Sequence, residues 1–217
     1  MTAQDALKSA LREVLSPVAR DHGYKGSSPN WRKSSAAGDW AIVNVQSSSS
    51  SSARSLSCVI NLAFAPEPWL RWHRSRRAHM PKAIPESLGL YRQRLGPVSG
   101  PTSSRGWWEV VDAESAGAVV TDMCAQLDRA GWPVLDEMFS REALKTRLEE
   151  GDLGFIKRAH FEYLFSDAEA LLLMDSGMSD ELESRLDSAM SHVPREKRDS
   201  TLQFVAWVRS QAVRGHG

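Results

Sequence analysis

The amino-acid sequence predicts an α+β fold, in which an antiparallel sheet of about five strands is flanked by an N-terminal and a following helix. An all-α extension comes after it. Two runs, Ala41–Gln46 and Leu56–Phe64, have the β-branched residues and near period-two alternation of half-buried strands. The serine block Ser47–Ser52 joins them and cannot bury enough apolar surface to repay its ordering entropy, so we expect a β-hairpin with a mobile polar tip. Apolar residues at three- and four-residue spacing precede and follow this region.

The first helix is predicted over residues 3–20, where seven apolar side chains fall on one face. Pro17 does not fit a helix interior, so we expect it to kink or end the helix. A short strand around Asn30–Lys33 then leads through the turn residues Gly38 and Asp39 into a strand that starts at Trp40. The first four predicted elements are therefore one helix followed by three strands.

Two prolines after Phe64 end the long strand, because proline cannot donate to a strand ladder. The stretch Trp69–Pro85 reads as a long loop or a short helix. Strand-like pieces follow at Leu90–Leu95 and Trp107–Val111, separated by the Gly-, Pro- and Ser-rich loop Gly96–Gly106. These two pieces complete the predicted sheet.

The remaining chain reads as helices. One helix is expected from about Ala113 to Arg129, stopped by the triplet Gly131-Trp132-Pro133, and from Leu135 onward the pattern is purely helical. We therefore divide the chain into an α+β domain, residues 1–133, and a helical C-terminal extension, residues 134–217. We predict that residues 1–133 form a separable folded unit.

The uneven distribution of charge along the sequence also supports a division of the chain into two parts. The 217 residues carry no formal net charge, but residues 1–111 hold 15 Lys and Arg against 7 Asp and Glu, whereas residues 136–187 hold 6 against 14. The two parts either dock on each other or face different partners.

Cys58 and Cys124 lie among apolar neighbours and are expected to be buried thiols rather than a disulfide. With neither a signal-peptide pattern nor an apolar run long enough to span a membrane, we expect a cytoplasmic protein that does not contact membranes.

Several short segments together resemble a known family. They comprise His22-Gly23-Tyr24, Trp31-Arg32-Lys33, Ile42–Ser48, Ile60–Ala63, Arg92–Gly96 and Trp107-Trp108. In these segments the chain resembles the bacterial DUF4304 family, of unknown function, over about residues 3–130. The resemblance implies an α+β fold with an antiparallel sheet and carries over no catalytic residue.

Catalytic motifs are not found in the sequence. None of the six histidines belongs to an HExxH motif or pairs with a cysteine at zinc spacing. There is no G-x-S-x-G elbow and no phosphate-binding glycine loop, and Cys58 has no adjacent base. We therefore predict no catalytic residue, no cofactor and no metal, and whether the protein is an enzyme stays open, with a non-enzymatic role favoured.

The basic stretch Trp69–Lys82 is the first functional candidate, with five positive charges and no acid. Its candidate partner-binding residues are Trp69, Arg71, Trp72, Arg74, Arg76 and Arg77. Arginines contact phosphates and tryptophans stack on unpaired bases, which favours nucleic acid. The other readings are a protein partner, a solvated cover of the sheet edge, and docking on the acidic helices of the same chain.

Trp107 and Trp108 are the second candidate, because neighbours on one strand point to opposite faces and one of them must leave the core side. That tryptophan either anchors a partner or is covered by the C-terminal helices.

Two candidate functions follow from the basic stretch and the tryptophan pair. The first is a non-enzymatic protein-interaction module, of which an immunity or toxin-neutralising role is one version. The alternative is a nucleic-acid-binding accessory protein that uses residues 69–82.

Overall fold

The structure is a computed structural model that describes residues 2–49, 52, 54–98, 102–103 and 106–214. Parts of the serine block Ser47–Ser52 and of the loop Gly96–Gly106 lie outside the described residues. The mobility expected for the serine tip therefore stays a prediction.

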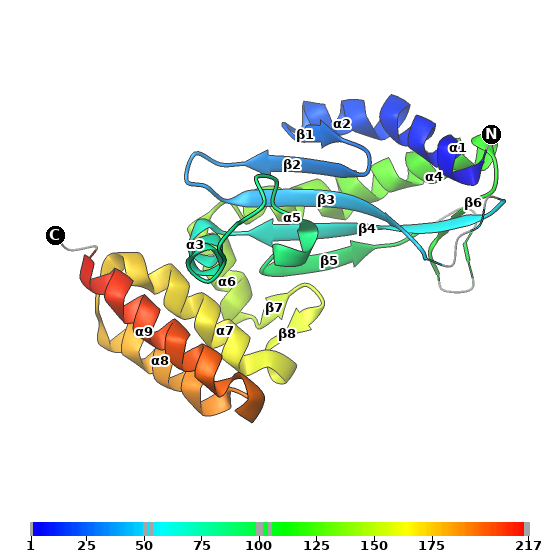
Figure 1. Ribbon diagram of the computed structural model, residues 1–217. Helices are drawn as coiled ribbons and strands as arrows, with labels where there is room; N and C mark the ends of the chain where they lie inside the picture. Colours follow the sequence, from blue (N-terminus) through cyan, green and yellow to red (C-terminus); the bar gives the residue numbers. More distant parts are fainter. Residues whose placement is uncertain (1, 50–51, 53, 99–101, 104–105, 215–217) are drawn as a thin grey trace.

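The main sheet has six antiparallel strands in the order β1-β2-β3-β4-β5, with β6 paired to β4 beyond the end of β5 (Figure 1). The predicted α+β class with an antiparallel sheet is confirmed. The strands are β1 Lys25–Ser27, β2 Asn30–Ser34, β3 Trp40–Ser47, β4 Leu56–Ala65, β5 Tyr91–Leu95 and β6 Trp108–Val110. The strand missing from the prediction is β1, whose three exposed residues show no alternation of apolar side chains.

The first face of the sheet carries the larger core. Alternate residues of β3 and β4 are buried on this face: Ala41, Val43, Val45, Cys58, Ile60, Leu62 and Phe64. The helices α1 Ala3–Ala10 and α4 Ala113–Gln126 lie on this side, next to each other (Figure 1). Trp31 and Trp108 join the same core from neighbouring strands, and both are fully buried.

Both helices on this face continue past a proline. The first ends within one residue of the range predicted for it, residues 3–20, whereas the second does not stop at the triplet Gly131-Trp132-Pro133 as predicted. The π-helical turn Leu11–Leu15 connects α1 to α2 Ser16–Asp21, and the π-helical turn Leu127–Gly131 connects α4 to α5 Trp132–Glu137. Pro17 and Pro133 each lie in the first turn of the helix that follows. A widened turn relieves the clash of a proline ring with the preceding carbonyls, so the chain keeps its helical course.

The second face is covered over part of its area by the segment that follows β4. This segment contains α3 Glu67–Ser75 and the 3₁₀ turn η2 Glu86–Leu88. A small core forms beneath it from Ile42, Ala63, Ala65, Leu70, Ile84 and Leu88. Arg32 fastens the segment to the sheet by donating from Nε to the carbonyl of Ile84, 2.8 Å away. The rest of this face bears mainly polar side chains, together with the buried Val59 of β4.

The C-terminal part lies at one end of the sheet, beside α3 (Figure 1). It consists of α6 Arg141–Glu149, β7 Asp152–Leu153, β8 Ile156–Lys157, α7 Arg158–Leu173, η4 Met174–Ser176, α8 Asp180–His192, η5 Arg195–Lys197 and α9 Arg198–Arg214. The expectation of purely helical structure is wrong at the β7–β8 hairpin. Its strands have two residues each, too few for a period-two pattern. Gly154 of this hairpin sits against the Arg92 carbonyl of β5, where a Cβ atom would come within 2.0 Å of the oxygen.

The described residues form two large cores, and the first of them contains residues from both sides of the predicted boundary at residue 133. The core on the first sheet face includes Leu144, Leu148, Leu153 and Phe165 of the C-terminal part. A second core lies among α7, α8 and α9. The division into residues 1–133 and 134–217 stays a prediction.

Candidate partner-binding surface

The polar part of the second sheet face forms one continuous surface, which we call the amide face. It comprises Asn30, Asn44, Gln46, Asn61, Arg94 and Trp107. Strand register places Asn30, Asn44, Asn61 and Arg94 directly opposite one another on four neighbouring strands. Gln46 and Arg94 are exposed, whereas Asn61 at the centre is only 2% exposed.

Hydrogen bonds run across these strands in one direction. Arg94 Nε donates to Asn61 Oδ1 at 3.1 Å, Asn61 Nδ2 donates to Asn44 Oδ1 at 3.2 Å, and Asn44 Nδ2 donates to Asn30 Oδ1 at 3.0 Å. Asn61 Nδ2 also donates to Gln46 Oε1 at 2.8 Å. Because a guanidinium has no acceptor, Arg94 fixes the orientation of each amide along the row. The row is therefore rigid and polarised in one sense.

Arg94 and Trp107 form the end of this row. Arg94 Cζ lies 5.4 Å from the centroid of the Trp107 ring, within the range of a cation–π contact. Trp108, the next residue, is fully buried on the first face, and its Nε1 donates to Asp122 Oδ2 at 2.8 Å. The expected opposition of the two tryptophans is confirmed: Trp108 belongs to the core, and the half-buried Trp107 belongs to the amide face.

A second arginine–aromatic pair stands beside the first. Arg92 precedes Arg94 by two residues on β5 and so shares its face of the sheet. Its Cζ lies 5.1 Å from the centroid of Phe155, a ring at the tip of the β7–β8 hairpin that is 49% exposed. The guanidinium also donates twice to Glu86 Oε1, from Nε at 2.9 Å and from Nη2 at 2.7 Å.

The two tryptophans of the basic stretch face inward. Trp69 donates from Nε1 to the carbonyl of Leu88 at 2.9 Å and packs between the cores. Trp72 belongs to the core of the C-terminal helices, with ring centroids 5.2 Å from both Phe204 and Trp207. Both side chains hold α3 in place, so their rings are not available for stacking on bases.

The arginines of this stretch have mixed environments. Arg71 donates to both carboxylate oxygens of Asp175, at 2.7 and 2.9 Å. Arg74 lies 3.4 Å from Glu67, and Arg76 covers the Trp72 ring and donates to Ser200 Oγ at 2.8 Å. The side chain of Arg77 is exposed and has neither hydrogen bond nor ion pair to any described residue. The basic stretch thus docks on the C-terminal helices through Arg71, Trp72 and Arg76.

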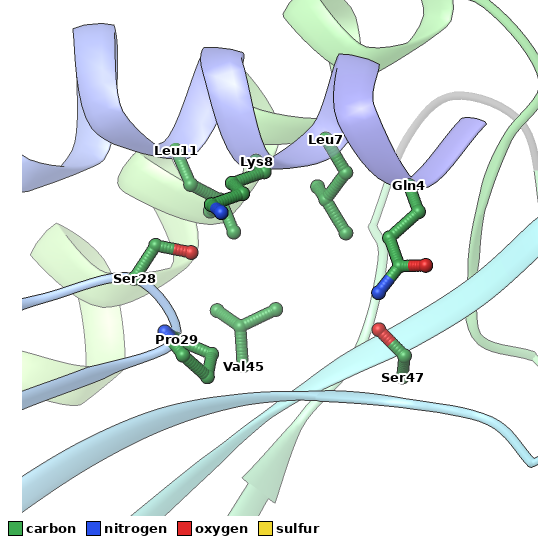
Figure 2. Close-up of a pocket in the computed structure, with 8 residues that line it drawn as sticks. All are labelled: Gln4, Leu7, Lys8, Leu11, Ser28, Pro29, Val45 and Ser47. Carbon is green, nitrogen blue, oxygen red and sulfur yellow. The ribbon is translucent and has the colours of Figure 1, made fainter. Parts of the chain in front are cut away.

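A groove lies on the other side of the sheet, between α1 and the end of β3 (Figure 2). Its volume is about 360 Å³, and its lining comprises Gln4, Leu7, Lys8, Leu11, Ser28, Pro29, Val45 and Ser47. Lys8 is the one ionisable side chain in that lining. The groove can accept a small apolar group, but it brings no acid and base together.

The thiols are poor nucleophiles. Cys58 and Cys124 are both free. Burial raises the pKa of the Cys58 thiol to about 12 and that of Cys124 to about 11, with Asp128 contributing to the second shift. Both therefore stay protonated near neutral pH, and the thiolate is the reactive form. Among the residues that the structure describes, no three His, Cys, Asp or Glu side chains are grouped so that they could hold a metal ion.

Comparison with known proteins places the chain in a family. Residues 15–137, more than half of the chain, match the family model described as Domain of unknown function (DUF4304). The chain belongs to the DUF4304 family. No curated protein and no solved structure matches it. The DUF4304 match covers the sheet and the helices α2, α4 and α5 but not α1, and all six residues of the amide face lie within it. Within the described part of the chain, no helix is long and apolar enough to cross a membrane.

Proposed function

We propose that this DUF4304 protein is a non-enzymatic protein-interaction module whose binding surface is the amide face. The observation that carries the proposal is the Arg94–Trp107 pair, held at the edge of a fixed row of amides. Tryptophan and arginine are enriched among the residues that contribute most to binding energy at protein interfaces. A rigid surface also loses little side-chain entropy when a partner binds.

The arrangement of the basic stretch favours a protein over a nucleic acid. Binding of single-stranded nucleic acid draws on aromatic rings that stack on bases. Trp69 and Trp72 are used inside the protein, and Arg94 occupies one side of the Trp107 ring. Phosphate contacts from exposed arginines such as Arg77 would remain, without stacking. A cytoplasmic location accompanies the proposal, because a reducing compartment preserves the free thiols Cys58 and Cys124.

Affinity capture tests the proposal. The tagged full chain, its Trp107→Ala variant and a matched Arg77→Ala variant are each incubated with native lysate, with and without nuclease treatment, and retained proteins are identified by mass spectrometry. We expect the wild type and Arg77→Ala to retain the same stoichiometric protein and Trp107→Ala to lose it. Thermal unfolding of each variant checks that the fold is intact. Equal retention by Trp107→Ala would contradict the proposal, and enrichment that nuclease abolishes would favour the nucleic-acid alternative.

A further inference from the structure

Arg92 and Arg94 have similar positions in the sheet but differ in their acidic partners. They lie two residues apart on β5, on the same face, and each guanidinium covers an aromatic ring, Phe155 in one case and Trp107 in the other. Arg92 is also paired with a carboxylate, because Glu86 accepts two hydrogen bonds from its guanidinium. Arg94 is exposed and has no carboxylate partner among the described residues.

The free donors of Arg94 have a defined direction. Its Nε–H is engaged by Asn61 Oδ1, so the four N–H groups on its two terminal nitrogens remain. Contact with the Trp107 ring and the bond to Asn61 together limit the rotation of the guanidinium. A planar, fixed fork of this kind matches a carboxylate, which it can bind through two parallel hydrogen bonds.

Resting on the proposed function, we infer that Arg94 is a subsite for an acidic side chain of the protein partner, which takes the position that Glu86 has at Arg92. Neighbouring groups extend this subsite. Gln46 is an exposed residue whose Oε1 atom accepts from Asn61, which leaves its amide nitrogen for a carbonyl of the partner. Arg94 is the one charged residue among the six of the amide face, and its charge is not neutralised by a carboxylate of any described residue, which favours an acidic partner over this surface.

A peptide array tests the inference with the full chain. The probes are immobilised ten-residue peptides that contain Glu or Asp, each with a twin that has Gln or Asn at the same positions. We expect a set of acidic peptides to bind roughly tenfold more tightly than their amide twins, as a charge-assisted fork implies. Arg94→Gln should remove that difference, whereas Arg77→Gln, which makes the same charge change outside the amide face, should keep it.

The outcomes separate this inference from the proposed function. If acidic and amide peptides bind equally and Trp107→Ala abolishes both, the acidic subsite is wrong and the interaction surface stands. If the difference persists in Arg94→Gln, or disappears equally in Arg77→Gln, the carboxylate is not read by Arg94 and the inference is overturned. A 20-nucleotide single-stranded DNA that displaces the acidic peptides, and that Arg94→Gln no longer binds, would assign the fork to phosphate. If the wild type binds no peptide and captures no protein, both fail.

Discussion

Asp39 joins three elements that are far apart in the sequence. Its carboxylate is 2% exposed and accepts from the backbone N–H of Glu67 at 2.8 Å, from Arg141 Nη2 at 2.7 Å and from Ser35 Oγ at 2.9 Å. It thereby connects the β2–β3 turn with the starts of α3 and α6. The sequence identified Asp39 only as a turn residue, because partners from residues 67 and 141 depend on the tertiary fold.

Asp39→Ala should lower the free energy of unfolding by about 2–4 kcal/mol, since it leaves buried donors unsatisfied and one arginine without its partner. Ser35→Ala, which removes a single neutral hydrogen-bonding group of the same cluster, should cost about 1 kcal/mol. Urea denaturation of both variants measures these losses. A change below about 0.5 kcal/mol for Asp39→Ala would show that the cluster does not stabilise the fold.

Asp167 of α7 gives the protein a pH dependence. Burial raises the pKa of this carboxyl to about 7, and Lys197 opposes the shift only in part. Its Oδ1 atom has no hydrogen-bond partner among the described residues. Between pH about 4 and 7 the folded protein keeps this proton while the unfolded chain has released it. Stability from this group is therefore present at low pH and lost as pH rises toward 7.

The free energy of unfolding should fall as pH rises through this interval, by at most about 1.4 kcal/mol per pH unit from Asp167. Asp167→Asn cannot ionise and should lack this fall. The free energy of unfolding of the variant should therefore rise relative to that of the wild type as pH increases. Urea denaturation at pH 4.5, 6 and 8 measures the difference. Parallel pH profiles for the two proteins would contradict the assignment.

Individual residues of the candidate surface could be predicted only in part. Period-two alternation is enough to place Trp107 and Trp108 on opposite faces. Asn44 and Asn61 also carry a signal, because each interrupts an apolar strand at a position that faces away from the core. The row they form with Arg94 could not be predicted, since it depends on the register of four strands.

At the scale of elements, the prolines show where local rules fail. Pro17 predicts a kink or an end in the first helix and Pro133 predicts the end of the second, yet both helices continue through π-helical turns before these prolines. No composition rule marks such a turn in the sequence. Apolar spacing gave the long helices correctly, whereas the short strands β1, β7 and β8 were missed because they have too few residues to show a period.

The docking of α3 depends on Trp72 more than on Arg71. Trp72→Ala should lower the free energy of unfolding by about 3–5 kcal/mol, because it leaves a cavity against Phe204 and Trp207. Arg71→Gln breaks a partly exposed ion pair with Asp175 and should cost about 1 kcal/mol or less. Hydrogen exchange of α8 and α9 should accelerate in the first variant only. Equal effects of the two changes would contradict this ranking.

At the scale of the whole molecule, the expected attraction between a basic and an acidic part is present at a few points. Lys33 pairs with Asp136 at 2.7 Å, and Arg71 pairs with Asp175 at the same distance. Partly exposed pairs of this kind each stabilise by about 1 kcal/mol or less. Apolar contacts such as those of Trp72 and Phe165 therefore contribute more to joining the parts.

Fragment 1–133 tests the predicted division of the chain. We expect it to keep its sheet and helices, but to unfold at a lower urea concentration than the full chain, because Leu144, Leu148 and Phe165 no longer cover the first core. Far-UV and near-UV circular dichroism with urea titration measure both properties. A fragment without cooperative unfolding would show that residues after 133 belong to the same folding unit.

Photo-cross-linking tests most directly whether the amide face binds a protein. A benzophenone amino acid is placed at Gln46 on that face, at Arg77 in the basic stretch, or at Arg20 on α2, and each full-length protein is irradiated in nuclease-treated native lysate. We predict a specific protein adduct from position 46 and none from positions 77 and 20. An adduct from position 77 or 20 without one from position 46, or no protein adduct at any position, would contradict the assignment of the amide face.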